Sequence, residues 1–158
     1  IGGGGFSELP LWPEVYVRCG SSINCLCDNV LPQHPSPFWG TPAMIAAVED
    51  LAVRFQAAHP NLRLRILDMS LPRGGLFDGG GNPPQYDWVT PHCRHRTGTS
   101  VDVSKYAVTV TNPGTVHIDV EKLTKLAHAT LSYLWAIFSR ITSVSGASIP
   151  CISRWLVK

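Results

Sequence analysis

The sequence has little net charge and no long apolar run. Its 158 residues carry 13 lysines and arginines against 11 aspartates and glutamates, a formal net charge of +2. The basic residues are scattered and form no stripe, so nucleic acid is not an expected partner. No stretch approaches the roughly 20 consecutive apolar residues that span a bilayer. We therefore expect no transmembrane segment.

The sequence also lacks a C-x-x-C pair, which argues against a zinc knuckle. Its five cysteines are an odd number, so at least one cannot pair within the chain. Cys25 and Cys27 would point to opposite faces of a strand and would not readily bond each other, whereas Cys19 could pair with either. The other two are Cys93 and Cys151. One hypothesis is therefore a secreted structural domain held together by disulfides.

An apolar fraction of 44% over this length is ordinary for one globular domain with a single core. Residues 1–38 are rich in Gly, Pro, Ser and Cys. They show little periodicity beyond Glu14–Arg18, which could be an edge strand. We expect residues 1–38 to form an arm, and residues 39–158 to form the domain proper.

Two segments have the apolar spacing of amphipathic helices. The first begins at Thr41, a predicted N-cap followed by proline, and ends near Ala58. The second runs from Val120 to Phe138, with Asp119 as its predicted N-cap.

Strands are predicted by alternation of apolar and polar residues. Leu62–Ile66 alternates with two arginines, which indicates a half-buried strand. Alternating apolar positions within Ile149–Val157 predict a last strand. This order predicts an α+β domain, in which helices pack on one face of a small antiparallel sheet and the functional cleft lies on the other.

The most informative segment is Pro91–Asp102, which contains the pattern H-x-x-G-x-x-x-D formed by His95, Gly98 and Asp102. An imidazole nitrogen and a carboxylate oxygen are two of the ligand types that zinc accepts. The glycine permits a tight or positive-φ turn that could fold His95 back over Asp102. The segment therefore predicts two protein ligands of a Zn²⁺ site.

The residues after the glycine agree with this interpretation. If Thr99–Ser104 is a strand, Val101 and Val103 point to one face and Asp102 points to the other. Asp102 would then face a polar cleft. The alternative is a solvated turn, in which Asp102 bonds local amides and the histidines lie on the surface.

Asp68 continues the apolar phase of the strand before it, so its carboxylate is predicted to point inward. A buried carboxylate needs a partner, because an unpaired buried charge costs several kcal/mol. One partner would be a metal-bound histidine, which Asp68 would orient. The other would be the backbone amides of the turn at Gly74 and Gly75.

These motifs resemble those of the penicillin-insensitive murein endopeptidases, within the zinc peptidases that include lysostaphin-type enzymes, D-Ala-D-Ala peptidases and hedgehog amino-terminal domains. The resemblance rests on Asp68-Met-Ser-Leu-Pro-Arg-Gly-Gly75 followed by His92-x-x-His95-x-x-Gly98-x-x-x-Asp102. It implies that His95 and Asp102 ligate zinc and that His92 lies at the rim of the site. In an active enzyme, His92 or an unidentified group would move protons. The resemblance also implies peptidoglycan peptides as substrate and a periplasmic or extracellular location.

One feature of that family is missing. The resemblance implies a third ligand from a His-x-His pair near the end of the domain, but no histidine follows His128. Arg154, Trp155 and Leu156 stand where the pair would be expected. The best internal candidate for the third ligand is His117. We therefore keep two hypotheses, a zinc-dependent murein endopeptidase and a non-catalytic binding module on the same scaffold.

The motif spacing predicts that His95→Ala removes zinc binding more completely than His92→Ala. His95 is a predicted ligand, whereas loss of a group outside the ligand shell costs about 10–100-fold in affinity. Calorimetric zinc titration of both variants measures this. An equal loss in the two variants would mean that His92 is itself a ligand.

Overall fold

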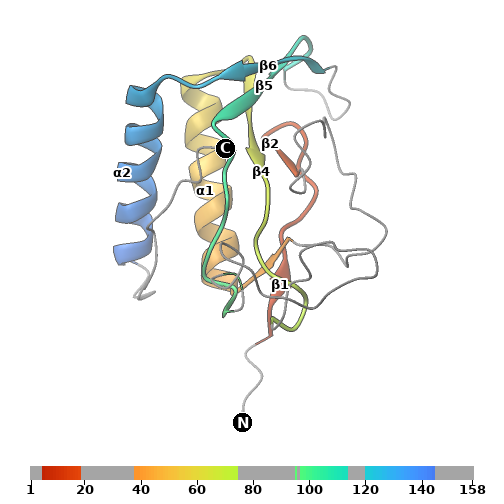
Figure 1. The fold of residues 1–158 in the computed structure, drawn as a ribbon, viewed down its shortest axis with the longest axis vertical. Helices are drawn as coiled ribbons and strands as arrows, with labels where there is room; N and C mark the ends of the chain where they lie inside the picture. The colour runs from red at the N-terminus through yellow and green to blue at the C-terminus, as the bar shows by residue number, and fades with distance from the viewer. Residues whose placement is uncertain (1–4, 19–37, 75–94, 96, 114–119, 145–158) are drawn as a thin grey trace, which may run out of the picture.

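A computed structural model describes residues 5–18, 38–74, 95, 97–113 and 120–144. Its elements follow the chain in the order shown in Figure 1: β1 (Ser7–Glu8), β2 (Tyr16–Arg18), β3 (Trp39–Gly40), α1 (Pro42–Ala58), β4 (Leu62–Ile66), β5 (Tyr106–Val110), β6 (Val120–Lys125) and α2 (His128–Val144). The predicted last strand within Ile149–Val157 and all five cysteines lie outside the described residues.

The main sheet has four strands in the order β2-β4-β5-β6. Strands β4, β5 and β6 are antiparallel, but β2 runs parallel to β4. The α+β class is confirmed, and the prediction of a purely antiparallel sheet is wrong. Neighbouring parallel strands need a crossover connection, and the chain from β2 to β4 passes through α1. Strands β1 and β3 form a separate antiparallel pair.

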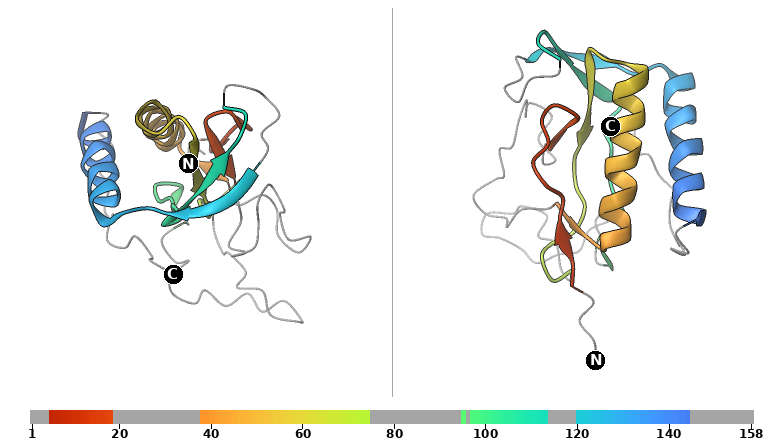
Figure 2. Two further views of the ribbon diagram at one scale, coloured as in Figure 1. Left: turned by 90° about the horizontal axis from the view of Figure 1, so that it is seen from above. Right: turned by 180° about the vertical axis from the view of Figure 1, so that it is seen from behind.

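Helices α1 and α2 lie side by side and cover one face of this sheet (Figures 1 and 2). Their buried residues meet inward-facing residues of β2, β4 and β5 in one apolar core. The largest fully buried apolar side chains of this core include Tyr16, Phe38, Phe55, Leu51, Leu64, Ile66 and Leu134. No helix of the described residues is both long enough and apolar enough to cross a membrane.

Helix α1 follows its sequence prediction at both ends. The hydroxyl of Thr41 accepts a hydrogen bond from the amide of Met44 at 3.2 Å, and Pro42 fills the first helical position. His59 ends the helix with its amide donating to the carbonyl of Phe55. The buried residues Met44, Ile45, Val48, Leu51, Ala52 and Phe55 recur at helical spacing.

The predicted helix over Val120–Phe138 is wrong in its first part. Val120–Lys125 is strand β6, paired with β5, and α2 begins only at His128. Pairing opposite Tyr106–Val110 provides backbone partners for this segment, and such tertiary context overrides helical spacing over a few residues. The predicted N-cap, Asp119, lies outside the described residues.

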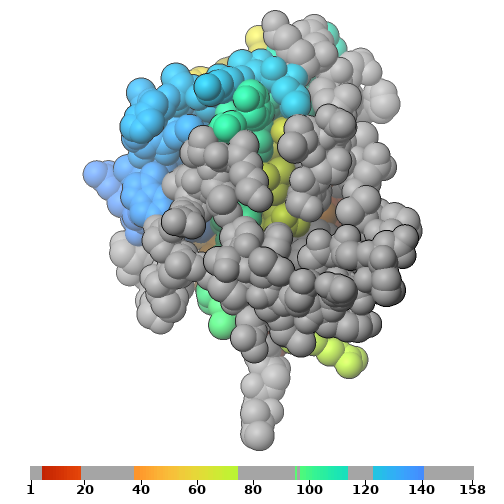
Figure 3. Space-filling view, in the orientation of Figure 1, coloured from red at the N-terminus to blue at the C-terminus, as the bar shows by residue number. Residues whose placement is uncertain are grey.

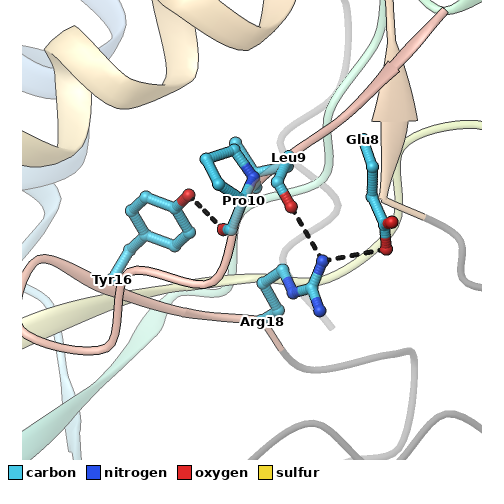
Figure 4. A network of polar contacts seen from close by, with 5 residues as sticks. All are labelled: Glu8, Leu9, Pro10, Tyr16 and Arg18. Atoms are coloured by element: carbon cyan, nitrogen blue, oxygen red, sulfur yellow. Dashed lines mark hydrogen bonds and ion pairs between the residues drawn. The ribbon is translucent and has the colours of Figure 1, made fainter. Parts of the chain in front are cut away.

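Polar contacts within the described part of the N-terminal segment join the end of β1 to β2 (Figure 4). The guanidinium of Arg18 donates to the Leu9 carbonyl at 2.7 Å and to the Glu8 carboxylate at 3.1 Å. The Tyr16 hydroxyl donates to the Pro10 carbonyl at 2.5 Å. Because β2 is an edge strand of the main sheet, the edge strand predicted within Glu14–Arg18 is confirmed.

Candidate metal site

The candidate site lies beyond the end of β4, where two backbone segments run antiparallel. The amide of Leu67 donates to the carbonyl of Asp102 at 2.8 Å, and the amide of Asp102 donates to the carbonyl of Asp68 at 2.8 Å. Nearer the sheet, Ile66 pairs with Val103 in an isolated bridge. These contacts place the two aspartates on adjacent segments, although the regular strand begins only at Tyr106 and not at Thr99 as predicted.

The side-chain phase of this segment agrees with its sequence pattern. Val103 belongs to the apolar core and Val101 packs against it. Since successive residues of an extended chain alternate, Asp102 lies on the opposite face. Its side chain is 20% exposed, so the carboxylate is largely shielded but reachable from solvent.

Gly98 makes the turn that returns His95 to Asp102. Its φ of 65° lies in the left-handed region that favours glycine, and its amide donates to the His95 carbonyl at 3.2 Å. Nε2 of His95 then lies 3.4 Å from Oδ2 of Asp102. The imidazole is buried, at 2% exposure. The predicted positive-φ turn is confirmed, and a surface position for His95 is excluded.

Two contacts that the sequence did not predict hold this turn in place. The Thr41 amide, at the start of α1, donates to the Gly98 carbonyl at 2.9 Å. The ring of Phe6 packs so closely on Gly98 that a Cβ there would lie 2.8 Å from it. Neither contact has a local sequence signal, because each joins residues far apart in the chain.

Asp68 is buried as predicted, at 4% exposure. Burial raises the pKa of its carboxyl to about 6; the nearby His95 opposes this rise and the negative charge of Asp102 adds to it. The amide of Gly74 donates to the Leu71 carbonyl and is therefore engaged elsewhere. Of the two predicted partners for the Asp68 carboxyl, this geometry favours His95 over the Gly74 amide. Gly75 lies outside the described residues.

The pKa of His95 reflects opposing effects. Burial alone would lower it, but the hydrogen bond and charge of Asp102, the charge of Asp68 and a hydrogen bond with the Ser100 backbone together raise it. Both carboxyl groups thus favour the positively charged form of the imidazole.

The spacing of the two donor atoms fits a zinc site. Bond lengths of about 2.0–2.2 Å and a tetrahedral angle place neighbouring ligand atoms about 3.4 Å apart. A short charged hydrogen bond between the same groups would measure about 2.7–2.9 Å, so the hydrogen bond in this structure is a long one. The observed 3.4 Å between Nε2 of His95 and Oδ2 of Asp102 matches the first value.

The remaining predicted site residues, His92 and His117, lie outside the described residues, as does Leu156. Within the described ranges, no group of three or more histidine, cysteine, aspartate or glutamate side chains is arranged to hold a metal ion. Among the described residues, His95 and Asp102 are thus a pair of candidate ligands. No protein-family model, curated protein or solved structure matches this chain.

We expect Gly98→Ala to destabilise the fold by about 1–3 kcal/mol, because alanine is strained at this φ and its Cβ would overlap Phe6. Gly5→Ala is the matched control, since a Cβ there meets nothing within 4 Å. Denaturant unfolding measures both changes. A loss no larger than that of Gly5→Ala would mean that the turn does not depend on glycine.

The pKa of Asp68 predicts a pH dependence of stability. A carboxyl with a pKa raised from 3.8 to about 6 binds its proton more tightly in the folded state. The contribution of protonated Asp68 to the free energy of unfolding is therefore complete below pH 3.8. That contribution, on the order of 3 kcal/mol, is lost as pH rises to about 6. The raised pKa of His95 extends the loss above pH 6.5.

Asp68→Asn isolates this effect in protein stripped of metal. The free energy of unfolding of the parent, minus that of the variant, should fall as pH rises from about 4 to about 6. Urea titrations across this window measure the difference. A difference that is constant or that rises with pH would show that the Asp68 carboxyl titrates normally.

Proposed function

We propose that this chain is a zinc-dependent peptidase domain that hydrolyses peptide crosslinks of peptidoglycan. The motifs around Asp68, His95 and Asp102 resemble those of the murein endopeptidases, and the site's chemistry is compatible with this activity. Because the substrate lies outside the cytoplasmic membrane, the proposal places the protein in the periplasm or outside the cell.

The observation that carries the proposal is the 3.4 Å approach of Nε2 of His95 to Oδ2 of Asp102. These atoms are a nitrogen and an oxygen donor of the kinds that zinc accepts, at the spacing of two ligands. They come from residues seven positions apart, and the turn at Gly98 is what brings them together.

In this proposal His95 and Asp102 hold the metal, and Asp68 keeps a negative charge beside the imidazole. When bound, zinc polarises a carbonyl and makes a water acidic enough to attack it near neutral pH. His95 must first lose its proton, so zinc and protons compete for its imidazole. Burial of His95 keeps the ligand out of bulk water.

The remaining roles belong to residues outside the described ranges. His92 is the proposed group that moves protons during hydrolysis. His117 is the proposed third ligand, because a catalytic zinc site usually has three protein ligands.

A second candidate function is that of a binding module that retains the scaffold without hydrolysis. It is favoured by Leu156, which has no electron pair to donate and which stands in the sequence roughly where a histidine ligand of the resembled family would be expected. The described ligand pair would then bind zinc weakly.

We expect zinc to raise the thermal stability of the parent and to support release of peptides from purified peptidoglycan. Asp102→Asn keeps the side-chain size but removes the charged ligand. It should abolish the zinc-dependent shift and lower hydrolysis by more than about 100-fold, the upper end of what loss of an outer-shell group costs.

His128→Ala is the matched control, because His128 is an exposed histidine on α2. It should leave both measurements unchanged. Zinc-loaded parent that releases no peptide would remove the catalytic proposal and leave the binding module. Equal zinc responses in parent and Asp102→Asn would remove the metal site itself.

A further inference from the structure

Strand β4 buries two arginines that its sequence pattern predicted to face solvent. Arg63 is 0% exposed and Arg65 is 3% exposed. Both belong to the face of the sheet opposite the helices, because Leu64 and Ile66 occupy the helix-facing core. The prediction of a half-buried strand is therefore wrong on this face.

The neighbours of these arginines across the sheet are apolar. Arg63 pairs with Val108 of β5, and Arg65 pairs with Val17 of β2. Val17 and Val108 form a second, smaller apolar cluster with Leu67 and Leu123 packed against it. Arg65 donates to the Ser104 hydroxyl at 3.3 Å. Two positive charges thus share a largely apolar face.

The guanidinium of Arg63 is engaged on one side only. Its Nη1 donates to the carbonyls of Pro60 and Leu62, at 2.6 and 2.8 Å. Its Nε and Nη2 are buried and have no hydrogen-bond partner in the part of the chain that the structure describes. In arginine, the N–H bonds of Nε and Nη2 point the same way and form the fork that binds both oxygens of one carboxylate.

A buried guanidinium with an unfilled fork is energetically costly, because arginine cannot shed its proton and an unpaired buried charge is unfavourable. Burial lowers the pKa of Arg63, and the charge of Glu14 partly opposes this. Among the described residues, however, neither Glu14 nor any other acid forms an ion pair with Arg63.

We propose that the Nε and Nη2 edge of Arg63, with Arg65 beside it, is a binding site for the carboxylate of a small organic acid or a peptide C-terminus. A carboxylate would satisfy both unfilled donors at once and would neutralise charge in apolar surroundings. Because Arg63 is buried, the ligand enters through local opening, and its association is slower than diffusion. This site does not depend on zinc.

The test compares the thermal unfolding midpoint in sodium acetate and in sodium chloride at equal ionic strength, with a chelator present. Acetate should raise the midpoint of the parent in a saturable way, as a ligand of the folded state does. Arg63→Met should lose this rise. In chloride, Arg63→Met should unfold at or above the parent midpoint, because it removes an uncompensated buried charge.

Arg54→Met is the matched control, since Arg54 is an exposed arginine paired with Asp50 on α1. It should keep the full acetate response. Nuclear magnetic resonance of the arginine Nε–H groups gives a second measurement on the parent alone, which does not require Arg63→Met to fold. A single Nε–H signal should shift and saturate with acetate.

Titration with N-acetylalanine distinguishes the two carboxylate sources. Tighter binding than acetate indicates a peptide C-terminus, and equal binding indicates a small acid. The proposal is overturned if acetate acts like chloride on the parent and moves no Nε–H signal. If acetate has no effect, and the effects of Glu14→Gln and Arg63→Met on stability are also not additive, then Glu14 is the anion that pairs with Arg63.

Discussion

The proposed function depends on the contact between the side chains of His95 and Asp102. The carboxyl groups of Asp68 and Asp102 raise the pKa of the buried His95 imidazole, which indicates a need for positive charge in the site. A metal ion would meet the same need with a larger charge. The backbone is arranged around this contact through the turn at Gly98, which the Thr41 amide and the Phe6 ring hold in place.

The same contact links the fold to the site. Asp68 and Asp102 lie on adjacent segments because the ladder between β4 and the segment before β5 continues past its regular end. The start of α1 contacts the turn through Thr41, so the helix that covers the sheet also positions the turn at Gly98. The candidate site lies in irregular backbone that hydrogen bonds join to α1 and to the segment after β4.

Features with local causes could be predicted from the sequence. Helix α1 has an N-cap, an early proline and an apolar stripe, all of which act within a few residues. The inward direction of Asp68 and the positive φ of Gly98 also follow from neighbours in the chain. Features set by distant partners could not be predicted. Val120–Lys125 is a strand because β5 pairs with it, and the burial of Arg63 and Arg65 beside Val108 and Val17 depends on the neighbouring strands.

The most direct test of the account is a crystal structure of the protein soaked with zinc, with the metal located by its anomalous scattering. We expect zinc between Nε2 of His95 and a carboxylate oxygen of Asp102, at about 2.0–2.2 Å from each. Zinc bound elsewhere, with the two side chains closed to a direct hydrogen bond of about 2.8 Å, would contradict it.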